Sequence, residues 1–286
     1  MKDFKGKIAI ITGGASGIGL ALANRCRDEG MHLILADIDE DKLEHAKSDL
    51  ARNDLKILTV KTDVSKIGDV KHLAKIAQDT FEEIHLLFNN AGVFTVNEIW
   101  NYTLADYNWI IGVNLWGTIH FLHAFLPILM KQTSDSYIVN TASIAGLLPG
   151  QGIYGLTKHA IVSLSETLYN DLKRAKINNI KVSVLCPTYV NTNLIESETY
   201  RPQELKNIDM DPKQQSKIAR IRWRKFQKAV STGQSVDIVV DSVFKGINQE
   251  KFYILTEENP WLIKSLKKRV ECIQNGVNPD DLPMSI

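Results

Sequence analysis

Ser143, Tyr154 and Lys158 place a hydroxyl, a phenol and an amine around one turn rich in glycine and proline. Tyr154 and Lys158 are four residues apart, so on a helix their side chains share a face. An ammonium group beside a phenol favours the phenolate and lowers the pKa of the tyrosine from about 10. This spacing therefore predicts that Tyr154 donates and accepts protons in catalysis.

The same spacing occurs a second time, at Tyr169 and Lys173, which provides an internal comparison. At a rise of about 1.5 Å per residue, Tyr169 lies roughly 22 Å from Tyr154 along one helix, so both pairs cannot serve one site. The second pair lies in a run rich in Asp and Lys. We interpret it as part of an ordinary amphipathic helix face.

The composition is that of a soluble globular protein with a full core: 286 residues, 44% hydrophobic and 23% charged. The net charge of +1 favours neither nucleic acid nor a membrane as a partner. Cys26, Cys186 and Cys272 are far apart and match no disulfide framework or metal site. No signal-peptide core is visible, and the most apolar stretch, 110–130, contains His, Asn and Pro and is expected to be a buried core helix. We expect a cytoplasmic protein that binds no metal.

Short apolar runs alternate with helical patterns along most of the chain. The expected strands are Lys7–Ile11, His32–Ala36, Lys56–Lys61, His85–Phe88, Tyr137–Asn140, Lys181–Leu185 and Phe252–Leu255. The expected helices cover about 18–30, 40–52, 67–82, 104–131, 153–175 and 235–247. This alternation predicts an α/β fold, in which a single Rossmann-type domain over 1–286 forms a doubly wound parallel sheet of about seven strands with helices on both faces.

Residues 188–235 interrupt this alternation with a polar start, two prolines and a basic segment. An insertion after a strand's carboxyl end lies where open α/β sheets bind ligands, so we expect 188–235 to form a substrate lid. Residues 257–286 form a C-terminal extension that could pack on a neighbouring subunit.

The segment 217–228 carries six cations interleaved with Trp223 and Phe226. Ala219, Trp223, Phe226 and Val230 form one apolar stripe at helical spacing, which favours a lid helix with a solvated basic side over a nucleic-acid site. A contact between one Arg and a substrate carboxylate or phosphate is a third possibility.

A glycine-rich turn follows the first strand and opens the first helix. Gly13, Gly17 and Gly19 allow a tight turn, close approach to a pyrophosphate and close packing of the helix on the sheet. The helix N-terminus then offers free N–H groups to phosphates. Because the turn lies between a strand and a helix, it predicts a dinucleotide site.

Asp37 ends the second strand, where a carboxylate can bind an adenosine ribose and would repel a 2′-phosphate. The glycine turn also lacks an Arg or Lys, so both features favour NAD over NADP. The alternative is that Asp37 belongs to a solvated acidic cluster with Asp39, Glu40 and Asp41. Two further strand ends, at 63–64 and 89–92, are expected to lie at the same carboxyl edge of the sheet and to line the same cofactor crevice.

These residues, in this order, resemble the classical short-chain dehydrogenases/reductases. The resemblance covers roughly 5–255 and rests on Thr-Gly-x-x-x-Gly-x-Gly at 12–19, Asp37, Asp63-Val64, Asn-Asn-Ala-Gly at 89–92, Val113-Asn114-Leu115-x-Gly117, Ser143 and Tyr154-x-x-x-Lys158.

The resemblance implies a role for each matching residue. Tyr154 is then the catalytic acid and base, Ser143 binds the substrate oxygen, Lys158 holds the nicotinamide ribose and lowers the pKa of Tyr154, and Asn114 supports a proton-relay water. For Asn114 the alternative is a polar residue bonded to backbone inside a helix. The implied cofactor contacts are Gly13, Ser16, Gly17, Ile18, Gly19, Asp37, Asp63, Val64, Asn90, Ala91, Gly92, Tyr154, Lys158, Pro187, Val190 and Thr192.

Two features depart from the family pattern. Pro187-Thr188 stands where Pro-Gly is common, and the interval of 11 from Ser143 to Tyr154 is about two shorter than expected. The opening Met-Lys-Asp-Phe, the stretch from Asp106 to Asn114, the long lid and the tail from Tyr253 are similar to a bacterial branch with NAD-dependent Cα-dehydrogenases of aryl alcohols. The apolar loop residues either line a pocket for a hydrophobic or aromatic substrate or pack beneath the lid: Val93, Phe94, Ile144, Leu147, Leu148, Ile153 and Tyr189.

We therefore expect an NAD-dependent oxidoreductase that interconverts a secondary alcohol and a ketone by hydride transfer. Two alternatives remain, an NADP-dependent carbonyl or 3-oxoacyl reductase and a non-catalytic dinucleotide-binding regulator. Asp37 disfavours the first, and the complete Ser, Tyr and Lys set disfavours the second. The family resemblance also implies a homodimer or homotetramer built on the helices near 104–131 and 153–175.

Overall fold

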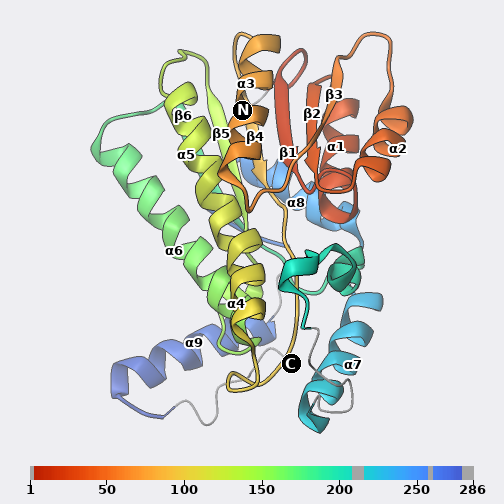
Figure 1. Cartoon of the computed structure of the whole chain (residues 1–286). Helices are drawn as coiled ribbons and strands as arrows, with labels where there is room; N and C mark the ends of the chain where they lie inside the picture. The colour runs from red at the N-terminus through yellow and green to blue at the C-terminus, as the bar shows by residue number, and fades with distance from the viewer. Residues whose placement is uncertain (1–2, 208–215, 257–259, 279–286) are drawn as a thin grey trace.

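Seven short apolar segments pair into one parallel sheet in the computed structural model, which describes residues 3–207, 216–256 and 260–278 (Figure 1). The strands are β1 (Ile8–Thr12), β2 (His32–Asp37), β3 (Ile57–Lys61), β4 (Leu86–Asn89), β5 (Ser136–Thr141), β6 (Ile180–Cys186) and β7 (Tyr253–Leu255). The α-helices are α1 (Gly17–Asp28), α2 (Glu40–Leu50), α3 (Ile67–Thr80), α4 (Leu104–Ile110), α5 (Gly117–Leu129), α6 (Gly152–Arg174), α7 (Lys217–Ser231), α8 (Val236–Asn248) and α9 (Pro260–Asn275).

The strand order is β3-β2-β1-β4-β5-β6-β7, and every pair is parallel. The chain leaves β1 towards β2 on one side and later returns to β4 on the other, so the order reverses between β1 and β4. At such a reversal the loops after the two strands diverge and leave a crevice at the carboxyl edge of the sheet. The predicted doubly wound α/β sheet of a single domain is confirmed.

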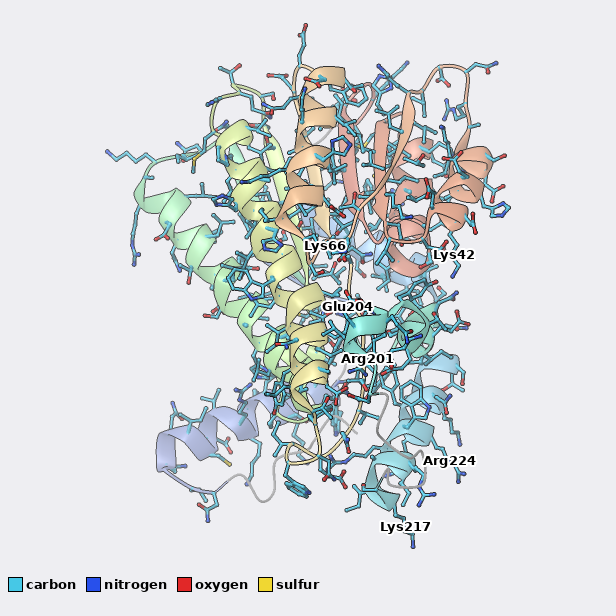
Figure 2. The ribbon with its side chains drawn as sticks, viewed as in Figure 1. Lys42, Lys66, Arg201, Glu204, Lys217 and Arg224 are labelled. Carbon is cyan, nitrogen blue, oxygen red and sulfur yellow. The ribbon has the colours of Figure 1, made fainter. Side chains whose placement is uncertain are left out.

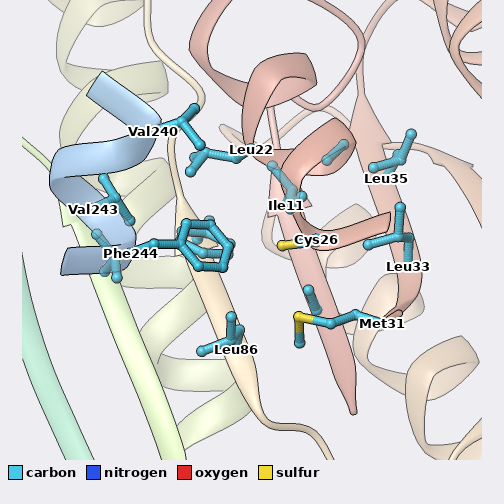
Figure 3. Close-up of a cluster of buried hydrophobic side chains, with 14 of the residues drawn as sticks. Ile11, Leu22, Cys26, Met31, Leu33, Leu35, Leu86, Val240, Val243 and Phe244 are labelled. Carbon is cyan, nitrogen blue, oxygen red and sulfur yellow. The ribbon is translucent and has the colours of Figure 1, made fainter. Parts of the chain in front are cut away.

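Alternating strand residues supply the cores of both faces. Ala9 and Ile11 of β1 pack with α1, α2 and α8 on one side, where Leu22, Cys26 and Phe244 are fully or almost fully buried (Figure 3). Ile10 points to the opposite side, into a cluster with residues of α3, α5 and α6. Because both faces are covered, the strands are continuously apolar rather than alternating in polarity.

The predicted helix over 104–131 is interrupted. Thr103 and Asp106 form a reciprocal capping box that starts α4. A π-helix, η1 (Ile111–Trp116), then separates α4 from α5. The wider turn of a π-helix is not signalled by apolar spacing, and such segments are often found at functional sites.

By length and apolar content alone, Leu104–Leu129 is the one stretch among the described helices that could cross a membrane. Phe121, Phe125 and Leu129 of this stretch are fully buried against the sheet. One face of this stretch therefore lies in the core, as expected, while Leu104 and Trp116 are exposed.

The lid region begins with two short 3-10 segments, η3 (Asn193–Tyr200) and η4 (Gln203–Leu205), and continues into α7. Residues 208–215 of the predicted lid lie outside the described residues. Both the 3-10 segments and α7 lie beyond the lower ends of the strands in Figure 1. The C-terminal extension contains α9, which crosses the lower end of α6 in Figure 1.

Candidate active site and dinucleotide groove

One cleft runs along the carboxyl edge of the sheet, from the glycine turn to the start of α6. It brings together nearly all of the sequence-predicted residues: Gly13, Ser16, Gly17, Ile18, Asp37, Asp63, Val64, Asn90, Ala91, Gly92, Ser143, Tyr154, Lys158, Pro187, Val190 and Thr192. Gly19 and Asn114 are the two predicted residues that do not line it.

The glycine turn has the geometry that a pyrophosphate needs. Gly13 and Gly17 adopt positive φ values of 62° and 51°, which side-chain-bearing residues rarely adopt. A Cβ on Gly19 would lie 1.9 Å from the carbonyl oxygen of Gly13, so only glycine fits there. Ser16 caps α1 without a side-chain hydrogen bond, which leaves the first N–H groups of the helix available to an anion.

The carboxylate of Asp37 is fixed beside this turn. It accepts hydrogen bonds from the backbone N–H of Ala15 (3.1 Å) and of Asp39 (3.2 Å). Burial raises the pKa of Asp37, and these hydrogen bonds act in the opposite direction. Asp37 is thus a positioned group of the cleft, whereas Asp41, four residues further on, is exposed.

Thr12, which precedes the glycines, joins the ends of β1 and β4. Its hydroxyl accepts hydrogen bonds from the N–H groups of Asn90 (2.9 Å) and Ala91 (3.1 Å) and donates one to the carbonyl of Phe88. Asn90 donates in turn to the carbonyl of Thr12 (3.1 Å). The motif at 12–19 contained Thr12, but its supporting role depends on pairing between distant strands.

Ser143, Tyr154 and Lys158 converge at the inner end of the cleft. The Ser143 hydroxyl lies near the Tyr154 phenol and accepts a hydrogen bond from the N–H of Ala145 (3.1 Å). Lys158 Nζ lies 5.4 Å from the centroid of the Tyr154 ring and donates to the carbonyl of Thr141 (2.8 Å). All three side chains are buried, with Tyr154 only 7% exposed.

Burial shifts the pKa values of the two titratable groups in opposite directions. Desolvation raises the pKa of Tyr154 to about 12, and the hydrogen bond from Ser143 lowers it by a smaller amount. Desolvation also lowers the pKa of Lys158 to about 8. The lowered tyrosine pKa expected from the four-residue spacing is therefore not found here, because burial is the largest influence on this group and raises its pKa.

Asn114 lies in the π-helix η1 and is fully buried. Its side-chain amide forms hydrogen bonds with other residues of the protein. The amide accepts from the N–H of Val93 (2.8 Å) and donates to the carbonyl of Val93 (3.0 Å) and the hydroxyl of Thr157 (3.2 Å). These bonds match the alternative role, a polar residue bonded to backbone. They hold the strand-end loop after β4 against η1 and α6.

The second tyrosine and lysine pair lies elsewhere, as expected. Tyr169 is 43% exposed, and its ring packs edge-on against Phe252 near β7. Neither Tyr169 nor Lys173 lines the cleft.

Aromatic rings cover the catalytic end of the cleft. Phe94 stacks on Phe226 of α7 with centroids 3.8 Å apart and meets Tyr154 edge-on at 5.0 Å. Trp223 and Tyr189 pack on the same group. Of the apolar loop residues with two possible roles, Val93, Ile144 and Tyr189 line the cleft, whereas Phe94, Leu147, Leu148 and Ile153 pack in clusters behind it.

The 3-10 segments of the predicted lid, with the residue that follows η3, contact both sides of the cleft. Tyr200 is hydrogen-bonded to the ammonium group of Lys42 on α2. Arg201, labelled in Figure 2, is buried. It pairs with Asp106 of α4 (2.5 Å) and lies over the ring of Trp109. Nothing in the local sequence pattern predicted these contacts, because their partners are about 100 residues or more apart.

The cations of α7 do not contribute to the cleft. Only Phe226 and Val230 of this helix line it, and Lys217 and Arg224 point away from the protein (Figure 2). The predicted apolar stripe is confirmed by the burial of Ala219, Phe226 and Val230. Among the described residues, Lys158 is the only Lys or Arg that lines the cleft. No group of His, Cys, Asp or Glu in the described part of the chain is arranged to hold a metal ion.

A family model for the short chain dehydrogenases matches residues 7–203, and the chain belongs to this family. Its members are oxidoreductases with the Rossmann fold seen here. A relative from Lactiplantibacillus plantarum, a CLA biosynthesis dehydrogenase/reductase, is 38% identical over 275 residues, covering 94% of this chain and 95% of the relative.

Solved structures show the same fold. A short chain dehydrogenase/reductase from Burkholderia phymatum in complex with NAD is 40% identical, covers both chains completely and has a TM-score of 0.93. The apo form of LigD from Sphingobium sp. strain SYK-6 is 25% identical, with a TM-score of 0.76 over 97% of this chain and 100% of LigD. A nicotinamide dinucleotide is therefore the cofactor class of this cleft.

Proposed function

We propose that this protein is an NAD-dependent dehydrogenase that interconverts a secondary alcohol and a ketone. One observation carries the proposal: Ser143, Tyr154 and Lys158 line the same cleft as the glycine turn and Asp37, with the Lys158 amine beside the Tyr154 ring. A dinucleotide regulator would need the turn and Asp37 but not a buried phenol and amine beside them.

The residues of the chain then have distinct tasks. Bound NAD supplies the hydride acceptor when the alcohol is oxidised, and the reduced form supplies the hydride in the reverse direction. Ser143 donates a hydrogen bond to the substrate oxygen, and Tyr154 exchanges the proton on that oxygen. Lys158 is held by the carbonyl of Thr141 next to the Tyr154 ring, where its positive charge favours the phenolate.

Asp37 and the glycine turn support NAD over NADP. The fixed carboxylate of Asp37 would repel a 2′-phosphate, and among the described residues the adenosine end of the cleft has no lysine or arginine in its wall. Asp63 also lies at this end, where its carboxylate binds Ser65 and the ammonium group of Lys66 (3.2 Å).

The substrate that fits best is uncharged and hydrophobic or aromatic. Phe226, Val230, Tyr189 and Ile144 form the apolar wall of the catalytic end, and no second cation among the described residues faces it. This fits the resemblance to the aryl-alcohol Cα-dehydrogenase branch. Substrates of the Lactiplantibacillus CLA biosynthesis dehydrogenase/reductase are a second group to test.

The remaining expectations extend this proposal. Residues 188–235 act as the substrate lid, 257–286 as an extension, and the protein works in the cytoplasm as a homodimer or homotetramer. Its partners are then the small-molecule substrate and further copies of the chain.

The test follows the reduction of NAD and of NADP by absorbance, with aliphatic and aromatic secondary alcohols as substrates. Tyr154→Phe is expected to lower kcat at least about 100-fold, because it removes the proton-transferring group. Tyr169→Phe is the matched control from the second pair and is expected to keep full activity. Equal activity in the Tyr154→Phe and wild-type proteins would disprove the mechanism, and a clear preference for NADP would support the NADP-dependent reductase instead.

A further inference from the structure

The C-terminal helix α9 lies outside the region that the family model matches, yet it packs under the catalytic loop. Leu262 of α9 is buried with Ile144 and Leu148, and Leu266 packs against the same group. Ile144 directly follows Ser143 and lines the cleft. One side of α9 is therefore part of the support beneath Ser143.

Arg269 of α9 connects this loop to helix α6. Its Nη1 donates a hydrogen bond to the carbonyl of Leu147, in the loop after Ser143. The same nitrogen lies 2.9 Å from Nε2 of His159, which is next to Lys158 on α6. A single guanidinium group thus holds the two segments that carry Ser143 and Tyr154.

The hydrogen-bond pattern defines the tautomer of His159. Its Nδ1 lies 2.9 Å from the carbonyl of Gly155, an acceptor, so Nδ1 carries the proton. Nε2 then carries the lone pair and accepts a hydrogen bond from the guanidinium group of Arg269. Burial and the adjacent guanidinium lower the pKa of His159, which favours this neutral form.

The loop needs support because its end has an unusual backbone. Gly150, Gln151 and Gly152 all have positive φ values, and at Gln151, with φ 59°, a side chain is present. Such backbone persists where surrounding contacts hold it. The short interval between Ser143 and Tyr154 leaves the loop few residues with which to hold itself.

We propose that Arg269 is a positioning residue, which holds the loop after Ser143 against the start of α6, where Tyr154 lies, by joining the Leu147 carbonyl to His159. This inference rests on the proposed dehydrogenase function. It assigns to the C-terminal extension a part in the reaction, although no residue of α9 lines the cleft among those described. Misplacing a reacting group by a small distance costs rate more than it costs binding of the distant adenosine end.

The test compares Arg269→Met, which keeps the apolar stem but removes the donors, with Arg269→Lys and with Lys268→Met. Lys268 is the exposed neighbour on the same helix and serves as the matched control. Arg269→Met is expected to lower kcat at least tenfold, with NADH affinity, measured by fluorescence titration, changed less than twofold. Arg269→Lys is expected to regain at least a third of the wild-type kcat, because an ammonium group can donate to the same acceptors. Lys268→Met is expected to change neither quantity.

Hydrogen exchange gives a readout that is independent of turnover. Amides of 143–152 are expected to exchange at least tenfold faster in Arg269→Met than in the wild type and Lys268→Met. Wild-type kcat together with unchanged exchange in Arg269→Met would overturn the positioning role, as would an equal loss of kcat and NADH affinity. If Arg269→Met does not fold, Arg269→Leu, which also lacks donors, takes its place, and a wild-type kcat with a wild-type exchange rate in that variant would overturn the positioning role. A wild-type protein that binds NADH but turns over no alcohol would refute the proposed function, while the exchange comparison would still decide whether Arg269 holds the loop.

Discussion

At the scale of single residues, the environment of Tyr154 and Lys158 decides how the site can work. Full burial makes the neutral form of each group easier to reach, so the pKa of Tyr154 is about 12 and that of Lys158 about 8. Near neutral pH the phenol keeps its proton and is ready to donate it to a carbonyl oxygen. Oxidation of an alcohol requires the phenolate instead.

Because oxidation needs the phenolate and reduction needs the phenol, the rates of the two directions are expected to depend differently on pH. The rate of alcohol oxidation is expected to rise with pH across the alkaline range, because the phenolate fraction of Tyr154 increases up to a pKa of about 12. The rate of ketone reduction is expected to be constant or to fall over the same range. Initial rates in both directions between neutral pH and the alkaline limit of stability test this, and a falling oxidation rate would contradict it.

Lys158 is expected to lower the free energy of unfolding, because its ammonium group is buried. Its folded-state pKa of about 8 lies below the ordinary value of 10.5, so the folded state binds fewer protons between these two values and stability rises with pH there. The penalty is fully present below about pH 8, where it amounts to about 3 kcal/mol. The hydrogen bond to Thr141 offsets about 1 kcal/mol of it.

Lys158→Met is therefore expected to stabilise the protein by about 2 kcal/mol at pH 7, or about 4 °C in Tm, while abolishing activity. The gain in Tm should shrink towards pH 10.5. Thermal unfolding at both pH values measures it, with Lys173→Met of the exposed second pair as control. A lower Tm for Lys158→Met at pH 7 would contradict the argument.

Asp37 is the residue expected to set the cofactor preference. Asp37→Asn keeps the shape of the side chain and removes the charge that would repel a 2′-phosphate. The ratio of kcat/KM for NADP to that for NAD is expected to rise at least tenfold. Asp41→Asn, in the exposed acidic cluster, should leave the ratio unchanged, and an equal effect of both variants would favour the acidic-cluster interpretation.

At the scale of elements, the lid is attached to the cofactor side of the cleft by Tyr200 and Lys42. Asp39 is near both groups, 3.4 Å from the Tyr200 hydroxyl and 3.8 Å from the ammonium nitrogen of Lys42. Because the lysine side chain is 36% exposed, solvent screening limits this contact to about 0.5–1 kcal/mol.

Tyr200→Phe is accordingly expected to speed NADH release about two- to fivefold, since the contact must break when the lid opens. Stopped-flow displacement of NADH measures the rate. Lys42→Met should have a similar effect, and the double variant should add little to either, as expected for two partners of one contact. Fully additive effects would show that Tyr200 and Lys42 act separately.

At the scale of the whole molecule, large apolar side chains remain exposed on the neighbouring helical segments α4, η1 and α6. They are Leu104 (81% exposed), Trp116 (51%), Leu156 (49%) and Tyr169 (43%). Exposed apolar surface of this kind is typical of an interface with another subunit. This agrees with the proposal that the homo-oligomer forms through these helices.

A charge in this surface should separate the subunits. Leu156→Arg is expected to convert the oligomer to monomers, because an unpaired charge is costly to bury in an interface. Light scattering coupled to size-exclusion chromatography measures the mass. Ile218→Arg, at an exposed position on α7, is the control and should keep the wild-type mass. A wild-type protein that is already monomeric would contradict the proposal.

That the residues of the predicted cofactor groove gather at one edge of the sheet could be predicted from the sequence, because their positions depend on local order. The glycines, Asp37 and the strand ends at 63–64 and 89–92 each follow an apolar strand, and parallel strands necessarily bring their carboxyl ends to one edge. The same reasoning located the elements of the sheet to within a few residues. It also distinguished the buried Tyr154 from the exposed Tyr169, once the other motifs were considered together.

Only the tertiary structure determined how these groups behave. Desolvation depends on everything packed around a side chain, so the spacing of Tyr154 and Lys158 could not reveal that burial raises the pKa of the first and lowers that of the second. The bonds of Asn114 to Val93, the π-helix around it, and the contacts of Arg201 and Arg269 join residues distant in the chain. Local patterns carry the chemistry of this protein, whereas long-range packing sets the protonation of its groups and the geometry in which they are held.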